Sequence, residues 1–328
     1  MTVTYCPIIR NGPNEKEVIQ SFGGFSHFED TKFERPLHPI VEVQSVDDLQ
    51  ALPLYEDAGE RVYIDLPVAH TERATKLTEG VTATLNKHGS REEFFREHSD
   101  QIGFPLISSL LEARQAPVEY GVHLSVHRAL EDKFDRIGHR LMIRSLKPGL
   151  TDKQKEALRE LAEVTRPDED VMMFDIVDSE RGEERRAEKD IRFLSNLFDG
   201  YETGVLNAFD PMNGQTKNRS PDLADRYNCD FFGDYAIDQR FPPKMGGRPK
   251  SVKLRHYHPE QRDVAVFPGK DYAVAGRDLL GWDEWDRDHC NHCRQISSLI
   301  QQGKGNDFNR WKQARMGHYI HSVVHGDA

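Results

Sequence analysis

The chain has 328 residues, of which 37% are hydrophobic and 30% are charged, and its formal net charge is −11 at pH 7. This length and composition exclude an extended disordered protein and suit one large domain, or a domain with a smaller appendage. The acidic balance argues against nucleic acid as the main partner, because phosphate binding needs clustered Lys and Arg.

Cysteine use and the first residues favour a cytoplasmic protein. Four cysteines are too few for a secreted disulfide framework in a chain of this length, so we expect reduced thiols. The sequence opens with "MTVTYCPIIRNGPNEKE", which has no basic segment followed by a long apolar one, and no uncharged apolar run reaches about 18 residues. We therefore expect no membrane partner.

Eight short apolar runs that meet polar residues are predicted to be strands. In chain order they are "CPIIRNG", "HPIVEV", "VYIDLP", "FPLISS", "RLMIRS", "MMFDIVD", "GVLNAF" and "FFGDYAID". Helical patterns fill most of the gaps, at residues 13–24, 45–52, 71–89, 90–103, 122–138, 151–165 and 185–200. Two of them open with a capping box, Ser90 with Glu93 and Thr151 with Gln154. The gap between the seventh and eighth strands is loop-like and shows little helical pattern.

Strands alternating with helices in this way predict an α/β fold, a (β/α)8 barrel of the TIM type over residues 1–250. The rival is an open doubly wound sheet, which normally shows a Gly-rich phosphate turn after its first strand; "RNGPNEKE" is not one. Residues 251–328 are rich in His, Trp and Gly. We expect them to form a C-terminal extension packed on the barrel.

The polar residues at the strand ends are the candidate catalytic residues. In such barrels the carboxyl ends of the strands form the site, so these side chains are expected at the mouth. The predicted ring consists of Arg10, Glu42, Asp65, Arg144, Asp175, Asn207 and Asp234. Its carboxylates suit Mg²⁺ or another hard cation, and its arginines suit a phosphate or carboxylate. The alternative is a set of internal ion pairs that cap the core without any chemistry.

The loops after the seventh and eighth strands are candidates for binding an anionic small ligand. Barrels of this type commonly bind phosphate there. The basic residues in these loops include Lys217, Arg219 and Arg248. The alternative is that they are solvated surface charges.

The segment "HCNHC" supplies Cys290 and Cys293 at the spacing of half a zinc site. The other half would come from His318 with His321, or from His256 with His258, although neither pair has the usual zinc-finger spacing. Trp311 and His318 are also candidate ligand-binding residues, and His318 is a candidate acid or base held over the mouth. A structural role in a helix beside Trp311 and Tyr319 is the alternative for His318. The cofactor is therefore open, with Mg²⁺ or Zn²⁺ as candidates.

Several segments resemble the beta protein family, named for a protein of a satellite phage. They are "YCPIIRNGPNEKEVI", "HPIVEV", "VYIDL", "FFGDYA" and "GNDFNRWKQARMGHYIHSVV", and together they span nearly the whole chain. The resemblance implies a role in conflict between phage and host, either anti-phage defence or the restraint of a toxic neighbouring protein. The matching positions are Arg10, Glu42, Asp65, Asp234, Trp311 and His318. A second His is expected next to His318 in this family, and Tyr319 stands there instead.

Two functions follow as hypotheses. The first is a binding and regulatory barrel that recognises a protein partner, such as a toxin or a phage protein, or a nucleotide-like signal. The second is a metal-assisted hydrolase or lyase that acts on a phosphorylated or nucleotide ligand at the barrel mouth. Substitution of the mouth carboxylates distinguishes them, because a metal site does not tolerate Asp65→Asn or Asp175→Asn.

Overall fold

A computed structural model gives the arrangement of the chain. It describes residues 3–10, 37–50, 62–67, 76–109, 118–144, 149–177, 184–207, 217–237 and 251–325, together with positions 12, 14, 15, 17 and 18.

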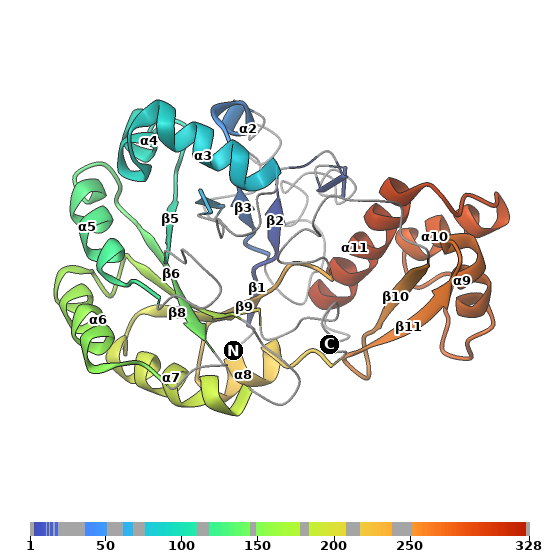
Figure 1. Ribbon diagram of the computed structural model, residues 1–328. Coiled ribbons are helices and arrows are strands. Elements are labelled where there is room, and N and C mark those ends of the chain that lie inside the picture. Colours follow the sequence, from blue (N-terminus) through green and yellow to red (C-terminus); the bar gives the residue numbers. More distant parts are fainter. Residues whose placement is uncertain are drawn as a thin grey trace.

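Parallel strands form a sheet that closes into a barrel (Figure 1). The strands are β1 (Thr4–Tyr5), β2 (Ile8–Arg10), β3 (Ile40–Glu42), β4 (Tyr63–Asp65), β5 (Pro105–Ser108), β6 (Gly138–Arg144), β7 (Val171–Val177), β8 (Glu202–Leu206) and β9 (Phe231–Gly233). The two ends of the sheet order, β1 and β2, belong to one continuous run of chain. One side of this run pairs with β9 and the other with β3, so the sheet has no open edge there. The described strands therefore occupy eight positions around a barrel.

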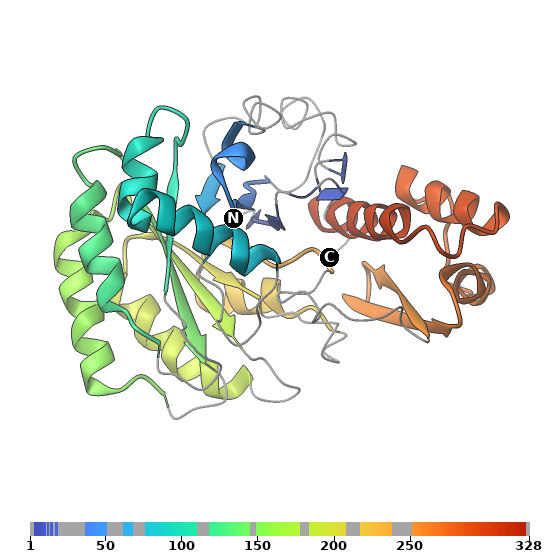
Figure 2. The same cartoon turned by 45° about the horizontal axis from the view of Figure 1, so that its top comes forward.

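Helices surround the barrel on its outside, as Figures 1 and 2 show. They are α2 (Val46–Gln50), α3 (Lys76–His88), α4 (Arg91–Glu97), α5 (Gly121–Leu130), α6 (Asp152–Val164), α7 (Glu184–Leu197) and α8 (Ser220–Arg226). Together with the all-parallel pairing, they confirm the predicted TIM-barrel type of fold. The gap between the seventh and eighth strands was expected to be loop-like, and that expectation is wrong for residues 220–226. Pro221 occupies the first turn of α8, where its fixed φ and missing N–H are tolerated.

Local sequence signals account for two of the helix starts. Thr151 and Gln154 form both halves of the predicted capping box at the start of α6. At α4, the Ser90 side chain accepts a hydrogen bond from the Glu93 N–H. Behind these caps, Leu158 and Leu161 of α6 and Phe94 and Phe95 of α4 are buried in the core between helices and strands.

The C-terminal unit, residues 251–325, consists of a hairpin and three helices. These are β10 (Val252–His258), β11 (Asp263–Gly269), α9 (Tyr272–Leu280), α10 (Asn291–Gln301) and α11 (Phe308–Val324). In Figures 1 and 2, α11 lies between the barrel and the rest of the unit. Its residues Tyr319 and Val323 join the barrel core, whereas Trp311 and Ala314 join the smaller core of the unit. This helix is therefore buried on two sides, and it fastens the unit to the barrel.

Candidate functional site at the barrel mouth

Arg140 of β6 lies inside the barrel and contacts three carboxylates. Its Nε donates to Asp175 Oδ2 at 2.8 Å, and its Nη1 donates to Asp65 Oδ2 at 2.7 Å and to Glu42 Oε1 at 3.0 Å. Its Nη2 donates to the Tyr235 hydroxyl at 3.0 Å. One guanidinium thus links strands β3, β4, β6 and β7 to Tyr235, which lies just after β9.

Further hydrogen bonds hold the carboxylates in place. Ser108 Oγ donates to Asp65 Oδ2 at 2.6 Å, Asn207 Nδ2 donates to Asp175 Oδ1 at 2.6 Å, and Tyr235 Oη donates to Glu42 Oε1 at 2.5 Å. The Arg10 guanidinium lies over the Tyr235 ring, 5.0 Å from its centroid, and its Nε is 3.6 Å from Glu42 Oε2. We call these residues, with Arg140, the mouth network.

Strand alternation and register explain why these residues meet. Successive side chains of a strand point to opposite faces, so Tyr63 and Asp65 face the interior while Ile64 faces the helices. Glu42 pairs with Asp65, and Ser108 pairs with Arg140, across neighbouring strands. Paired residues lie at the same level, and the network forms one layer at the carboxyl ends of the strands.

The mouth network is almost completely buried. The side chains of Arg140 and Glu42 are each 2% exposed and those of Asp65 and Asp175 are 0% exposed, whereas Arg10 is 12% exposed. Burial lowers the pKa of Arg140, but Tyr235 and the three carboxylates outweigh it and raise that pKa well above its ordinary value. Burial raises the pKa of Asp65, although Arg140 opposes the shift. The guanidinium therefore stays charged and holds the three carboxylates together.

This arrangement differs from a site built for a hard cation. A Mg²⁺ ion needs several carboxylate oxygens directed at one point. Here each of the three carboxylates directs an oxygen at Arg140 instead. The second oxygen of Asp65, Oδ1, is buried and has no hydrogen-bond partner among the described residues.

Five residues of the predicted ring, Arg10, Glu42, Asp65, Asp175 and Asn207, are brought together in this layer. Arg144 ends β6, and its side chain lies outside the described residues. Three network residues, Ser108, Arg140 and Tyr235, are absent from the predicted ring. The signal that points to them is a polar or aromatic side chain at an inward position of its strand.

Asp234 does not face the mouth, which corrects its predicted position. Phe231 and Tyr235 face the interior, so Asp234 faces the outside of the barrel. There it accepts hydrogen bonds from Tyr5 Oη at 3.0 Å and Tyr319 Oη at 2.5 Å. Burial raises the pKa of Asp234 to about 6. Its described contacts thus fasten α11 to the barrel.

The candidate ligand-binding residues are spread over several places. Lys217 and Arg219 are exposed immediately before α8, and Arg248 lies outside the described residues. Trp311 is fully buried in the core of the C-terminal unit, where its ring stacks on Tyr272 and its Nε1 donates to the Lys304 carbonyl at 2.9 Å. Trp311 was predicted to bind a ligand, and here its side chain is enclosed by the core of the C-terminal unit.

His318 lies beside the two cysteines of the "HCNHC" segment. Its Nδ1 is 3.7 Å from Cys290 Sγ and 3.3 Å from Cys293 Sγ, and the two sulfurs are 3.5 Å apart. Their shared hydrogen bond lowers the pKa of Cys290 and raises that of Cys293. The ring of His256 stacks on the His318 ring, with centroids 4.1 Å apart. We call these four residues the Cys–His cluster.

The chain was compared with protein families, curated proteins and solved structures, and similarity was found among the solved structures. No family model and no curated protein matches the chain. The crystal structure of a D-tagatose 3-epimerase-like protein matches with 11% identity and a TM-score of 0.37, over 71% of this chain and 90% of that chain. Likeness at this level carries no argument about activity. The beta protein family resemblance therefore stays a prediction.

None of the described helices combines the length and the apolar character needed to cross a membrane.

Proposed function

We propose that the protein is a binding and regulatory barrel that works in the cytoplasm as part of an anti-phage defence or toxin-restraining system. The observation that supports a binding scaffold is the closure of the mouth carboxylates on Arg140, and the defence role is taken from the family resemblance of the sequence. A divalent cation would have to displace this guanidinium and leave it buried without its partners, which costs several kcal/mol. The mouth network therefore favours a preformed scaffold over a metal-dependent active site.

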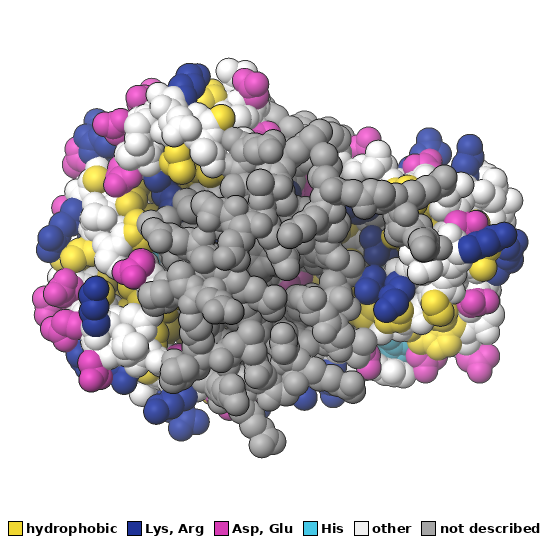
Figure 3. Space-filling view, in the orientation of Figure 1, with side chains coloured by type: hydrophobic (Ala, Val, Ile, Leu, Met, Phe, Trp, Pro, Cys, Tyr) yellow, Lys and Arg dark blue, Asp and Glu magenta, His cyan; other side chains and the backbone are white. Residues whose placement is uncertain are grey.

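The C-terminal unit offers a surface for a protein partner. The large hydrophobic side chains that are most exposed among the described residues are Val266, Leu280 and Phe308, at 38%, 39% and 38%. All three belong to this unit. Figure 3 shows a group of hydrophobic side chains on one part of this unit, with acidic and basic side chains around it. The centre of a protein interface is more apolar than its rim and is enriched in aromatic residues, so we expect a toxin or phage protein to bind here.

Protection of cells tests this proposal. Plating of phage, or growth in the presence of the neighbouring toxic protein, is compared for wild type, Asp65→Asn, Phe308→Asp and the matched control Ala83→Asp, which lies on an exposed position of α3. Asparagine has nearly the same shape as aspartate, and in Asp65→Asn the ion pairs of Arg140 with Glu42 and Asp175 remain. This variant is therefore expected to fold and to protect. Phe308→Asp is expected to fold and to lose protection, while Ala83→Asp retains it. Loss of protection in a folded Asp65→Asn variant would overturn the proposal.

The second candidate is a metal-assisted hydrolase or lyase at the mouth. Asp65 Oδ1 favours it, because a buried carboxylate oxygen without a hydrogen-bond partner is suited to accept a proton or a cation. If the protein is such an enzyme, the same experiment should give the opposite result: Asp65→Asn should fold and fail to protect cells. It also expects wild-type activity to depend on added Mg²⁺. An anionic ligand would then contact Arg10, which pairs with Glu42 and is the most exposed of the ion-paired residues of the mouth network.

A further inference from the structure

Three residues of the Cys–His cluster, Cys290, Cys293 and His318, have the spacing of three ligands in a tetrahedral metal site. Zinc binds sulfur at about 2.3 Å and histidine nitrogen at about 2.0–2.1 Å, so tetrahedral ligands stand about 3.8 Å apart for two sulfurs and about 3.6 Å for sulfur and nitrogen. The observed separations are 3.5 Å between the sulfurs of Cys290 and Cys293, and 3.7 and 3.3 Å from these sulfurs to His318 Nδ1. Both cysteines are free, so no disulfide explains their approach.

The hydrogen bond on the far side of His318 fixes which nitrogen faces the sulfurs. His318 Nε2 is 2.8 Å from the Tyr257 carbonyl oxygen, which can only accept, so Nε2 carries the proton. In the neutral ring, Nδ1 then presents a lone pair to the two sulfurs. Histidines that bind metals are typically oriented in this way, with the other nitrogen donating to a carbonyl or a carboxylate.

Cys290 is also placed as a thiolate ligand. Cys290 is the N-cap residue of α10, and its Sγ accepts from the Cys293 N–H at 3.4 Å. Backbone N–H groups and the positive end of a helix stabilise a thiolate. Two sulfurs and one nitrogen lone pair directed at the same small space form a set of donors suited to a metal cation.

His256 of β10 is the fourth candidate ligand. One of its ring nitrogens lies within 4.8 Å of the ligand atoms of Cys293 and His318. Its Nδ1 is buried and has no hydrogen-bond partner among the described residues. A metal lies in the plane of the ring that binds it, whereas the rings of His256 and His318 are stacked at an angle of 10°. The His256 ring must therefore turn when it binds.

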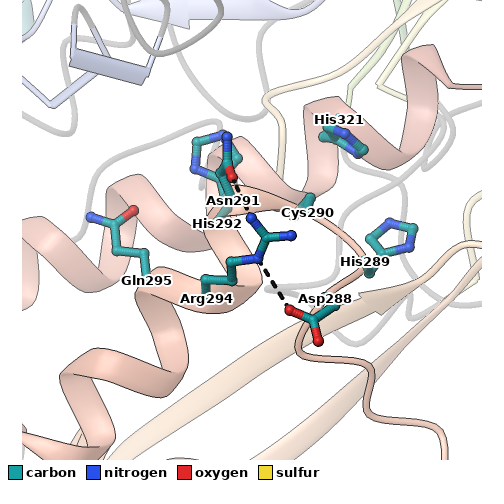
Figure 4. Close-up of a pocket in the computed structure, with 8 residues that line it drawn as sticks. All are labelled: Asp288, His289, Cys290, Asn291, His292, Arg294, Gln295 and His321. Atoms are coloured by element: carbon teal, nitrogen blue, oxygen red, sulfur yellow. Dashed lines mark hydrogen bonds and ion pairs between the residues drawn. The ribbon is translucent and has the colours of Figure 1, made fainter.

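We propose that Cys290, Cys293, His318 and His256 bind one Zn²⁺ ion that fastens α10, α11 and β10 together. Two sulfur and two nitrogen ligands in a tetrahedron favour zinc over harder cations. The buried hydrophobic core of this unit is small, and units of this size commonly use a metal to supplement such a core. The ion reaches the site from the pocket of Figure 4, which has a volume of about 360 Å³ and is lined by Cys290, His289 and His321.

Metal content and cobalt spectra test the proposal on the full chain, purified without an affinity tag that binds metal. Wild type is expected to contain one zinc per chain and, after chelation and reloading with Co²⁺, to show thiolate-to-cobalt charge transfer and tetrahedral d–d bands. Cys293→Ser is expected to lose both signals. The matched control Cys229→Ser, which removes a buried free cysteine of the barrel, is expected to retain them.

The fourth ligand is tested by a second pair of variants. His256→Ala is expected to lower zinc affinity at least about tenfold, because even loss of a residue that orients a ligand costs 10–100-fold. His289→Ala, which removes a histidine of the pocket beside the site, is expected to leave affinity unchanged. Equal affinity in His256→Ala and wild type would remove His256 from the site. Wild-type protein that contains no zinc, gives no cobalt–thiolate band or carries a Cys290–Cys293 disulfide would overturn the proposal; because these are wild-type measurements, misfolding of a variant cannot obscure them.

Discussion

Tyr319 of α11 donates a hydrogen bond to Asp234 Oδ2 at 2.5 Å, and Asp234 also accepts from Tyr5 Oη and from the Ala236 N–H. The carboxylate follows β9, so this contact joins the C-terminal unit to the strand that closes the barrel. On the helix, the next residue back is His318 of the Cys–His cluster. The docking of the unit and the arrangement of the cluster are thus coupled through two neighbouring residues of α11.

Asp234 is expected to make stability fall as pH rises from about 4 to about 6. Burial raises its pKa to about 6 in the folded protein, against an unfolded value near 3.8. Between these values the folded state binds more protons than the unfolded state, so stability decreases with pH, by up to about 3 kcal/mol. Urea unfolding of wild type and Asp234→Asn at several pH values measures the difference. Between pH 4 and 6.5 the unfolding free energy of wild type should fall by about 3 kcal/mol relative to that of Asp234→Asn. A difference that does not change with pH would contradict the raised pKa.

Arg140→Met is expected to destabilise the protein by at least about 3–5 kcal/mol. The substitution leaves Glu42, Asp65 and Asp175 buried without a cation, and an uncompensated buried charge costs this much. Chemical denaturation measures the loss. Because Arg140→Met alone risks not folding, the variant that adds Asp65→Asn and Asp175→Asn serves as the comparison. It removes two of the uncompensated charges and should recover a substantial part of the lost stability; no recovery would show that the charges are not the cause.

The barrel strands β2 to β9 were predictable from sequence because each contains apolar residues and each gap between them is long enough for a crossover. The sequence did not show which residue of each strand lies in the mouth layer. Strands in a barrel are staggered, so the same layer falls at different points along each of them. Glu42 and Asp65 end their strands, whereas Arg140, paired with Ser108, lies four residues before the end of β6. The expectation that the polar residue at the end of each strand lies at the mouth therefore selects Arg144, whereas the mouth layer contains Arg140.

Alternation within a strand would have corrected one further assignment. In "FFGDYA" the inward positions are Phe231, Gly233 and Tyr235, which directs Asp234 outward. The Cys–His cluster was half predictable, since Cys290-x-x-Cys293 is a local signal. Its histidines come from two elements that are far apart in sequence, one from each of the two predicted pairs, and only the packing of α11 on β10 brings them together.

A chain of buried histidines is expected to limit stability in acid. Ser109 Oγ lies 2.8 Å from His123 Nε2, and His123 Nδ1 lies 3.2 Å from His139 Nδ1. Burial lowers the pKa of His123 to about 3. Below pH 6.5 the unfolded chain therefore binds a proton that the folded protein excludes, and stability is lost as pH falls, by about 2–3 kcal/mol from pH 6.5 to pH 4.5.

His123→Gln removes this titrating group and keeps a polar side chain beside Ser109. The pH dependence of its unfolding free energy should be shallower than that of wild type in the same interval. This dependence is opposite in sign to that of Asp234, so measurements on the two single variants separate the contributions. If the unfolding free energies of wild type and His123→Gln fall equally between pH 6.5 and pH 4.5, the lowered pKa of His123 is contradicted.

Gly204 is expected to be essential for the packing of the barrel interior. It pairs with Phe231 across β8 and β9, and a Cβ atom at position 204 would lie 1.9 Å from the Phe231 ring. The ring is buried between strands in a closed layer, so Gly204→Ala forces side chains or strands to move, at a cost of about 1–3 kcal/mol. Gly121→Ala is the matched control, because a Cβ there meets nothing within 4 Å at the start of α5. It is expected to be neutral or to stabilise by up to about 1 kcal/mol, since alanine restricts the unfolded chain. Urea midpoints of the two variants should therefore move in different directions or by clearly different amounts, and equal shifts would show that the Phe231 ring relaxes freely.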